Sequence, residues 1–268
     1  MTAPDPEPFT KESIRRNLST AFMGRDLFFY DTLPTTMDVA DMKAVAGASE
    51  GVVVIADDQT AGRGRFDREW VAERNATIAV SVVLRPPPPV SSRLHIVCSL
   101  AVARAIESAT GLGPAIKWPN DVLLGGKKTS GILLTSNRDR DGRPYVNAGI
   151  GINVNQTPDS LATITPPATS LRVGSSQPVS RTKVFCALLH HLEKLYLEAL
   201  SGADLLDVWR SYLVTLGQQV RVQWRREDML GFVEEGRAED VDEFGRLLLR
   251  TDAGDIKTLV SGEVTLHN

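Results

Sequence analysis

The sequence predicts an α+β protein with a helix-containing main domain and a small antiparallel β-barrel at its C-terminal end. Strand-like runs such as Val52–Ala56 and Thr77–Leu84 alternate with helical stripes, the longest of them at 180–200. From Gly217 onward, five short β-rich runs with glycines at the turns replace the helical pattern, which is typical of a small barrel. We therefore expect a tail and short helix at 1–24, a main domain at 25–216 and a C-terminal domain at 217–268.

Composition limits the classes of function. The 268 residues, 42% hydrophobic and 24% charged, fit a globular protein with one sizeable core, and the net charge of -3 gives no global basic field for nucleic acid. Cys98 and Cys186 form neither a disulfide framework nor a metal pattern, and no apolar run approaches the ~20 residues of a membrane span. We expect a cytoplasmic protein without membrane or nucleic-acid partners or chain-built metal ligands, as a monomer or homodimer.

The N-terminal region is expected to hold one helix, at Lys11–Met23, before a strand at Asp26–Tyr30. A single helix cannot supply a helix-turn-helix. The hydroxyls of Thr35 and Thr36 then fit the N-cap of a helix that runs to about Ala46. Capping is the simpler role for both threonines, and ligand binding at that helix N-terminus is the alternative.

The stretch Gln59–Trp70 follows the buried strand directly. Gly62 and Gly64 allow close backbone approach to a ligand, and three guanidiniums lie on the same short connection, at Arg63, Arg65 and Arg68. Guanidinium donors match carboxylate or phosphate oxygens bidentately, so a polyanion such as a nucleoside triphosphate is the expected guest. A solvated basic turn or a DNA-contacting loop is the alternative.

A second informative stretch is 115–135. Gly125 and Gly126 between two apolar runs predict a hairpin, and Pro119 inside its first strand favours a sheet edge or a bulge. Lys127 and Lys128 at the tip do not match a phosphate-binding P-loop, because no serine or threonine follows the first lysine. Adjacent lysines at such a tip are most often solvated.

The segment 146–155 is predicted to be a strand whose Gly149 and Gly151 leave one face free of side chains. A flat ligand could lie on that face, or a helix could pack closely on it. The remaining pattern predicts a break at 86–89, a loop at 160–178, and helices at 92–108, 180–200 and 203–216.

Together these motifs resemble those of biotin protein ligases, which attach biotin to a lysine of biotin-dependent carboxylases. The matching segments are Gly62–Arg65 with Arg68 and Trp70, Lys117–Asp121, Lys128, and Gly149–Asn153. The resemblance covers the chain from about Phe28 to the C-terminus. It implies a class II synthetase-like catalytic domain with a mixed or antiparallel sheet, followed by an SH3-like domain.

The resemblance also implies a two-step reaction that uses biotin, ATP and Mg²⁺. Biotin is first activated as biotinyl-5'-AMP and then transferred to a lysine of a biotin carboxyl-carrier protein of acetyl-CoA carboxylase or a related carboxylase. The implied catalytic residues are Lys128, Arg65 and Arg63. The implied biotin-binding residues are Thr35, Thr36, Met37, Gln59, Arg63, Gly64, Arg65, Lys128, Gly131, Gly149 and Gly151. The implied nucleotide-binding residues are Arg65, Arg68, Trp70, Lys117, Asn120, Lys128 and Asn153.

The sequence departs from the family pattern at two places. Met37 follows the two threonines where the family has an asparagine, and Thr129–Ser130 replaces an aliphatic and a small residue. The winged helix of the repressor members has no counterpart, so the resemblance is to the monofunctional class. The alternatives are a lipoate or octanoate ligase of the same superfamily and, more remotely, a DNA-binding repressor. A cysteine-nucleophile transferase is disfavoured because Cys98 lies in an apolar helix.

Overall fold

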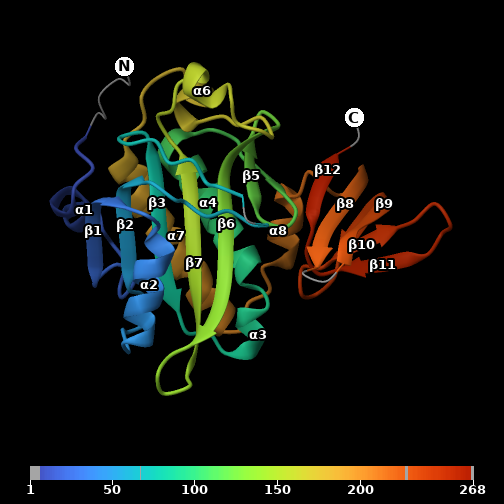
Figure 1. Cartoon of the computed structure of the whole chain (residues 1–268), viewed down its shortest axis with the longest axis horizontal. Coiled ribbons are helices and arrows are strands. Elements are labelled where there is room, and N and C mark those ends of the chain that lie inside the picture. The colour runs from blue at the N-terminus through green and yellow to red at the C-terminus, as the bar shows by residue number, and fades with distance from the viewer. Residues whose placement is uncertain (1–6, 67, 227–228, 267–268) are drawn as a thin grey trace.

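The computed structural model describes residues 7–66, 68–226 and 229–266, without the side chains of 224–231. Its larger part is a seven-stranded sheet in the order β1-β2-β3-β7-β6-β5-β4 (Figure 1). The β1–β2 pair is parallel and the other pairs are antiparallel, so the sheet is mixed as expected. The strands are β1 (Leu27–Leu33), β2 (Val53–Gln59), β3 (Thr77–Leu84), β4 (Ala115–Lys117), β5 (Asp121–Leu124), β6 (Lys127–Arg138) and β7 (Pro144–Asn153).

Helices cover both faces of this sheet. Helix α2 (Thr36–Val45) lies on one face, while α4 (Leu94–Thr110) and α7 (Arg181–Leu200) pack against each other on the opposite face (Figure 1). Val53 and Ile55 belong to the large core with α4 and α7, and Val54 belongs to the smaller core under α2. Strand β2 is therefore buried on both faces, which explains its unbroken apolar run. The shorter helices are α1 (Lys11–Asn17), α3 (Pro88–Ser91), α5 (Pro158–Leu161), α6 (Leu171–Ser175) and α8 (Leu206–Tyr212).

The C-terminal part is a five-stranded antiparallel sheet beside the main sheet (Figure 1). Its strands are β8 (Gln219–Arg226), β9 (Met229–Val241), β10 (Leu247–Arg250), β11 (Ile256–Leu259) and β12 (Glu263–Leu266). Their order across the sheet is β11-β10-β9-β8-β12. The five predicted runs are thus five strands, although β11 and β12 are edge strands of a ladder that does not close among the described residues. Trp118 joins the two parts, because its indole donates to the Gly245 carbonyl at 2.9 Å.

The first helix is shorter than predicted. It ends at Asn17 instead of Met23 because the Glu193 carboxylate on α7 accepts the backbone N–H groups of Ala21, Phe22 and Met23 at 2.6 to 2.8 Å. This tertiary contact holds residues 21–23 in a turn, where their N–H groups are not available to a helix. The predicted tail at 1–8 lies mostly outside the described residues.

Other expected elements were wrong in detail. The single strand expected before Gly125 is two strands, β4 and β5, which pair with each other around Trp118–Asn120, and β4 is an edge strand as Pro119 suggested. The expected loop at 160–178 contains α6 and the end of α5, both N-capped by hydroxyl side chains. The break at 86–89 runs into α3, and α8 covers only part of 203–216.

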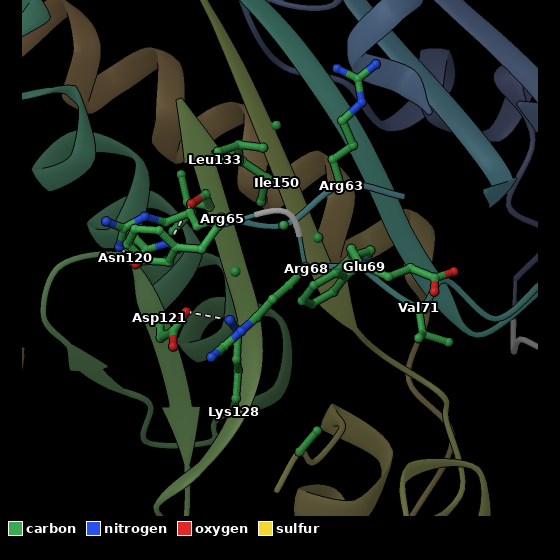
Figure 2. A pocket seen from close by; sticks show the side chains of 18 of the residues that line it. Arg63, Arg65, Arg68, Glu69, Val71, Asn120, Asp121, Lys128, Leu133 and Ile150 are labelled. Atoms are coloured by element: carbon green, nitrogen blue, oxygen red, sulfur yellow. Dashed lines mark hydrogen bonds and ion pairs between the residues drawn. The ribbon is translucent and has the colours of Figure 1, made fainter. Parts of the chain in front are cut away.

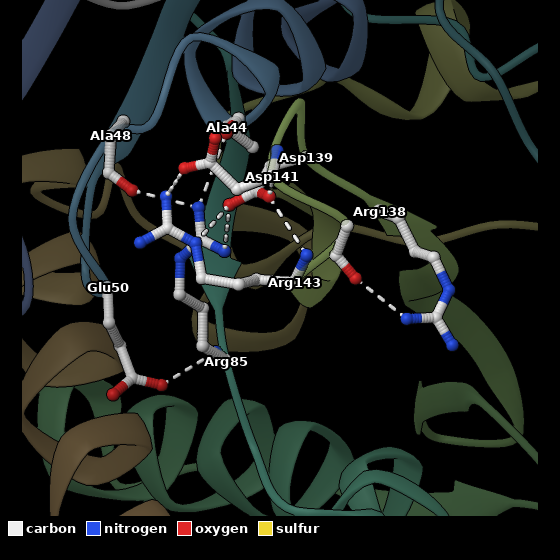
Figure 3. A network of polar contacts seen from close by, with 9 residues as sticks. Ala44, Ala48, Glu50, Arg85, Arg138, Asp139, Asp141 and Arg143 are labelled. Atoms are coloured by element: carbon white, nitrogen blue, oxygen red, sulfur yellow. Dashed lines mark hydrogen bonds and ion pairs between the residues drawn. The ribbon is translucent and has the colours of Figure 1, made fainter.

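Helix α2 is anchored at its C-terminal end by Arg85. The Arg85 guanidinium donates to the carbonyls of Ala44 and Ala48 at 3.3 and 3.1 Å, and to Asp139 Oδ2 at 2.9 Å (Figure 3). Asp139 lies in the turn between β6 and β7, so one side chain connects the helix, β3 and that turn. The N-terminal end of α2 is thereby held over the middle of the sheet. Within the described part of the chain, no helix has the length and hydropathy to cross a membrane.

Candidate active site

A cavity of about 160 Å³ lies on the sheet face that carries α2, and residues 262–264 of the C-terminal part also line it. Figure 2 shows lining side chains from the arginine loop and from β5, β6 and β7. Every residue that the sequence analysis assigns to biotin, to nucleotide or to catalysis lines this cavity. These residues come from the start of α2, the end of β2, the arginine loop, and strands β4 to β7. The fold therefore brings all the predicted site residues together.

The start of α2 supplies two hydroxyls. Thr35 is the N-cap residue, because its Oγ1 accepts the Met37 N–H, so the capping role is confirmed for Thr35 and wrong for Thr36, and both residues line the cavity. The Thr36 N–H donates to Gln59 Oε1 at 2.7 Å, and Thr36 Oγ1 lies 2.8 Å from Ser81 Oγ. The helix N-terminus and the end of β2 are thus joined at the cavity wall.

The glycines of β7 allow close contacts over the sheet. A Cβ added to Gly149 would lie 2.9 Å from Met37 Sδ, and one added to Gly151 would lie 2.3 Å from Trp70 Cε2. The flat group on Gly151 is therefore the indole of Trp70, which also contacts Gly131. Its Nε1 is buried without a hydrogen-bond partner. Side chains at these glycines would displace cavity-lining residues.

Lys128 and Asp121 form the centre of the charged wall. Lys128 Nζ lies 2.6 Å from Asp121 Oδ1, and Lys117 Nζ lies 3.7 Å from Asp121 Oδ2 (Figure 2). Lys127 is exposed and does not line the cavity, so the two adjacent lysines have different surroundings, and only Lys127 fits the expectation of a solvated side chain. Asp121 was quoted in the sequence motif but not assigned to the site, and its contacts place it there.

The three arginines of the loop have different partners. Arg63 points outward (Figure 2) and pairs with Asp38 on α2. Arg68 forms a bidentate ion pair with Glu263 of β12. Arg65 donates to Asn120 Oδ1 at 2.7 Å and to the Gly262 carbonyl at 3.2 Å. The loop therefore bridges the main domain and the C-terminal sheet.

Arg65 is electrostatically distinct from the other two. Burial lowers its pKa, opposed by the nearby carboxylates of Asp121 and Glu263. Among the described side chains, no carboxylate lies within 4.0 Å of its guanidinium nitrogens. A largely desolvated cation with only neutral hydrogen-bond partners gains more from an arriving anion than one already paired with a carboxylate.

Two segments of the cavity were not predicted from the sequence. Gly262–Val264 lines it from the C-terminal part, and Ile164, Thr165, Pro166 and Ala168 line it from the loop between α5 and α6. The loop is fixed by Lys128, whose backbone carbonyl accepts the Thr169 N–H at 2.8 Å. Neither segment contains a motif that would point to a binding site. They contribute to the cavity through the position of their backbone and through one charged side chain, that of Glu263.

The cavity has an excess of positive charge in a chain with a net charge of -3. Its basic side chains are Arg63, Arg65, Arg68, Lys117 and Lys128, and its acidic ones are Glu69, Asp121 and Glu263. This local field suits a polyanionic ligand. Asn153 contributes differently, since its amide is engaged with the Thr169 carbonyl and with Gln156 Nε2 and so supports the wall.

A cysteine nucleophile does not fit this site. Cys98 is fully buried on α4 and does not line the cavity, and desolvation raises the pKa of its thiol to about 12. A thiolate is the reactive form of cysteine, so Cys98 is inert near neutral pH.

The fold and this cavity define a ligase of the class that the biotin/lipoate A/B protein ligase family model describes. That model matches residues 30–155, and the model of the biotin protein ligase C-terminal domain matches residues 215–266. The second match is to a domain described for biotin protein ligases. The chain belongs to the biotin protein ligase family, and its activity is that of a biotin–protein ligase.

Individual relatives agree with this assignment. The chain is 36% identical to the bifunctional ligase/repressor BirA of Bacillus subtilis, over 97% of its length and 80% of the relative's. It is 34% identical to the biotin–[acetyl-CoA-carboxylase] ligase of Mycobacterium tuberculosis, over 97% and 96%. The Aquifex aeolicus biotin protein ligase solved in complex with biotin and ATP has 27% identity and a TM-score of 0.74, covering 91% of this chain and 99% of that one.

Proposed function

We propose that the chain activates biotin with ATP in this cavity and transfers it to a lysine of a biotin carboxyl-carrier domain of acetyl-CoA carboxylase or a related carboxylase. In the first step the biotin carboxylate attacks the α-phosphate and pyrophosphate leaves. In the second step the lysine amine attacks the acyl carbon of biotinyl-5'-AMP, and AMP leaves. Both steps bring electron-rich groups together, so positioning and positive charge supply most of the catalysis.

The observation that carries this proposal is the meeting of the cationic wall and the glycine face in one cavity. Lys128 and Arg65 would hold the biotin carboxylate and the α-phosphate, with Arg63 closing the loop over the adenylate. Arg68 would bind the leaving phosphates after it releases Glu263. Thr35, Thr36 and Gln59 would hydrogen-bond the biotin ring system, which Met37, Gly64 and the glycines of β6 and β7 enclose.

The nucleotide would lie along the arginine loop and β4. Trp70 would pack against it, Lys117 and Asn120 would face the phosphates, and Asn153 would support the wall beside it. The described residues hold no group of three acidic, histidine or cysteine side chains that could bind a metal ion. Mg²⁺ would therefore arrive on the ATP phosphates and neutralise their charge, with Asn120 and Asp121 as the protein oxygens on that side of the cavity.

The decisive experiment is incubation of the protein with ATP, biotin and an isolated carboxyl-carrier domain, followed by mass spectrometry of the carrier. We expect the carrier mass to increase by one biotinyl group, with pyrophosphate released in equal amount. Replacing biotin with lipoate or octanoate should give no increase. Transfer of lipoate in preference to biotin would favour the rival ligase activity, and a gel shift with promoter DNA would test the absence of nucleic-acid binding.

A further inference from the structure

A buried hydroxyl pair connects the first turn of α2 to β3, and one of its members, Thr36, is assigned above to the biotin ring system. Thr36 Oγ1 and Ser81 Oγ are 2.8 Å apart, and the two residues are 3% and 0% exposed. Thr36 lines the cavity, whereas Ser81, on β3, is not among the described residues that do so. Ser81 therefore reaches a ligand only through Thr36.

The direction of the hydrogen bond within this pair follows from counting protons. Each hydroxyl has one proton to donate, and only one of the two lies between the oxygens. Among the described residues Ser81 has no second side-chain partner, so donation by Thr36 would leave the Ser81 proton buried without an acceptor. A buried donor left unsatisfied is costly. Ser81 is therefore the donor, and the Thr36 proton is left to point into the cavity.

The side chain of Gln59 also presents a hydrogen-bond donor to the cavity beside Thr36. Its Oε1 accepts the Thr36 N–H at 2.7 Å, so its Nε2 is the end that remains to donate. A ligand that meets both Thr36 and Gln59 must offer hydrogen-bond acceptors there. The ring system of biotin carries such acceptors, a ureido oxygen and a thioether sulfur.

The first turn of α2 is also held by contacts that do not involve Ser81. Asn147 Nδ2 donates to the Met37 carbonyl at 2.9 Å, and Met37 packs on Gly149, the residue paired with Ser81 across the strands. Removal of the Ser81 hydroxyl therefore leaves the helix in place. What changes is the hydroxyl of Thr36, which loses its donor and can turn its own proton away from the cavity.

We infer that Ser81 is a positioning residue for substrate recognition, which donates to Thr36 and thereby fixes Thr36 as a hydrogen-bond donor to the biotin ring system. This inference rests on the proposed biotin site. It deepens that proposal, because it assigns a specificity role to a residue outside the cavity and a direction to the hydrogen bond inside it.

The test compares Ser81→Ala, Thr36→Val and the double variant in biotin-dependent pyrophosphate release. Ser81→Ala should raise the KM for biotin about tenfold, as expected for one hydrogen bond, with kcat and the KM for ATP within about twofold of the parent. The double variant should match Thr36→Val, because Ser81 acts through Thr36. Ser81→Cys, which places a weaker donor on a slightly larger side chain at the same position, should give an intermediate KM.

Ser99→Ala is the matched control. Ser99 is also 0% exposed, and it accepts the Trp209 indole N–H at 2.9 Å on α4, away from the cavity. Its loss should lower the melting temperature without changing the KM for biotin. A parent protein that releases no pyrophosphate would contradict the proposed function itself.

An active parent whose KM for biotin is unchanged in Ser81→Ala would overturn the inference alone. Additive effects in the double variant would overturn it too, since Ser81 would then act independently of Thr36. If Ser81→Ala does not fold, Ser81→Cys decides, and a KM equal to that of the parent counts against the inference.

Discussion

At the scale of single residues, Lys128 and Lys127 are adjacent in sequence but have different surroundings. Lys128 pairs with Asp121 inside the cavity, and Lys127 is exposed at the β5–β6 turn. Under the proposed function, the Lys128 ammonium beside Asp121 is the cation that faces the developing phosphate charge. A preorganised cation of this kind acts without reorganisation during the reaction.

We predict that Lys128→Ala lowers biotin-dependent pyrophosphate release by about a hundredfold, which corresponds to about 3 kcal/mol of lost transition-state stabilisation. Lys127→Ala, as the matched control, should stay within a few-fold of the parent. Single-turnover pyrophosphate release measures both variants. Equal losses, or a larger loss in Lys127→Ala, would contradict the assignment of Lys128.

Position 151 needs a glycine because an added Cβ would overlap the Trp70 indole, and not because its backbone conformation excludes other residues. We predict that Gly151→Ala moves Trp70 off the sheet and raises the KM for ATP about tenfold or more, in line with the 1–3 kcal/mol cost of overpacking. Gly113→Ala is the control, because a Cβ there meets no atom within 4 Å. An unchanged KM in Gly151→Ala would show that Trp70 does not serve the nucleotide.

Arg65 connects the loop to Asn120 and to the Gly262 carbonyl, so it closes the cavity on the side of the C-terminal sheet. We predict that Arg65→Gly releases biotinyl-5'-AMP, which then labels lysines of bystander proteins. Incubation with serum albumin and a streptavidin blot measures this release. Arg74→Gly, which removes an exposed arginine bonded to Thr32 outside the cavity, should label the carrier alone. Carrier-only labelling by Arg65→Gly would refute the assignment.

At the scale of elements, the arginine loop and strand β12 form one unit across the two sheets. Arg68 is paired with Glu263, and Lys117 Nζ donates to the Val264 carbonyl at 3.2 Å. The Glu263 carboxylate is paired with Arg68, the same arginine that would bind the phosphates of ATP. Because Arg68 is about half exposed, the Arg68–Glu263 pair contributes no more than about 1 kcal/mol of stability.

We therefore predict that Glu263→Gln lowers the KM for ATP by about two- to fivefold, since the competing carboxylate is removed. Glu234→Gln is the control on the same sheet, because Glu234 is paired with Lys257 away from the cavity. Pyrophosphate release against ATP concentration gives both values. A higher KM in Glu263→Gln would show that Glu263 assists nucleotide binding instead of competing with it.

At the scale of the whole molecule, stability in acid depends on buried carboxylates such as Asp139. Desolvation raises the pKa of Asp139, but the N–H groups of Arg143 and Asp141 and the guanidiniums of Arg143 and Arg85 outweigh it and lower the pKa below its usual value (Figure 3). The stability from Asp139 is thus fully present above its unfolded pKa of about 3.9 and is lost as pH falls through the folded pKa.

We predict that Asp139→Asn lowers the melting temperature at pH 7 and that the difference from the parent shrinks as pH falls below about 4. Thermal unfolding followed by circular dichroism from about pH 7 down to about pH 2.5, a range that includes the unfolded pKa of about 3.9, measures this. Asp141→Asn is the control, because that side chain is exposed in the same turn. A difference that stays constant with pH would rule out the charge of Asp139 as the cause.

The sequence by itself determined the class of fold and the family, and it predicted a set of site residues that all line one cavity. Continuous apolar runs, helical periodicity and the change at Gly217 are local patterns, and they predicted most elements of both sheets. The glycine–arginine loop, the Lys117–Asp121 motif and the glycine strand carry chemistry in short segments, so they could be recognised without coordinates.

Tertiary structure alone decided which distant groups meet. Glu193 on α7 accepts the N–H groups that follow α1, Glu263 lines the cavity from the last strand, and Ser81 on β3 contacts Thr36. Each of these contacts joins residues from separate elements, and each side chain is unremarkable in its own segment. Pattern and propensity act over a few neighbouring residues, whereas such contacts depend on how the sheets and helices pack, which is why only the folded chain discloses them.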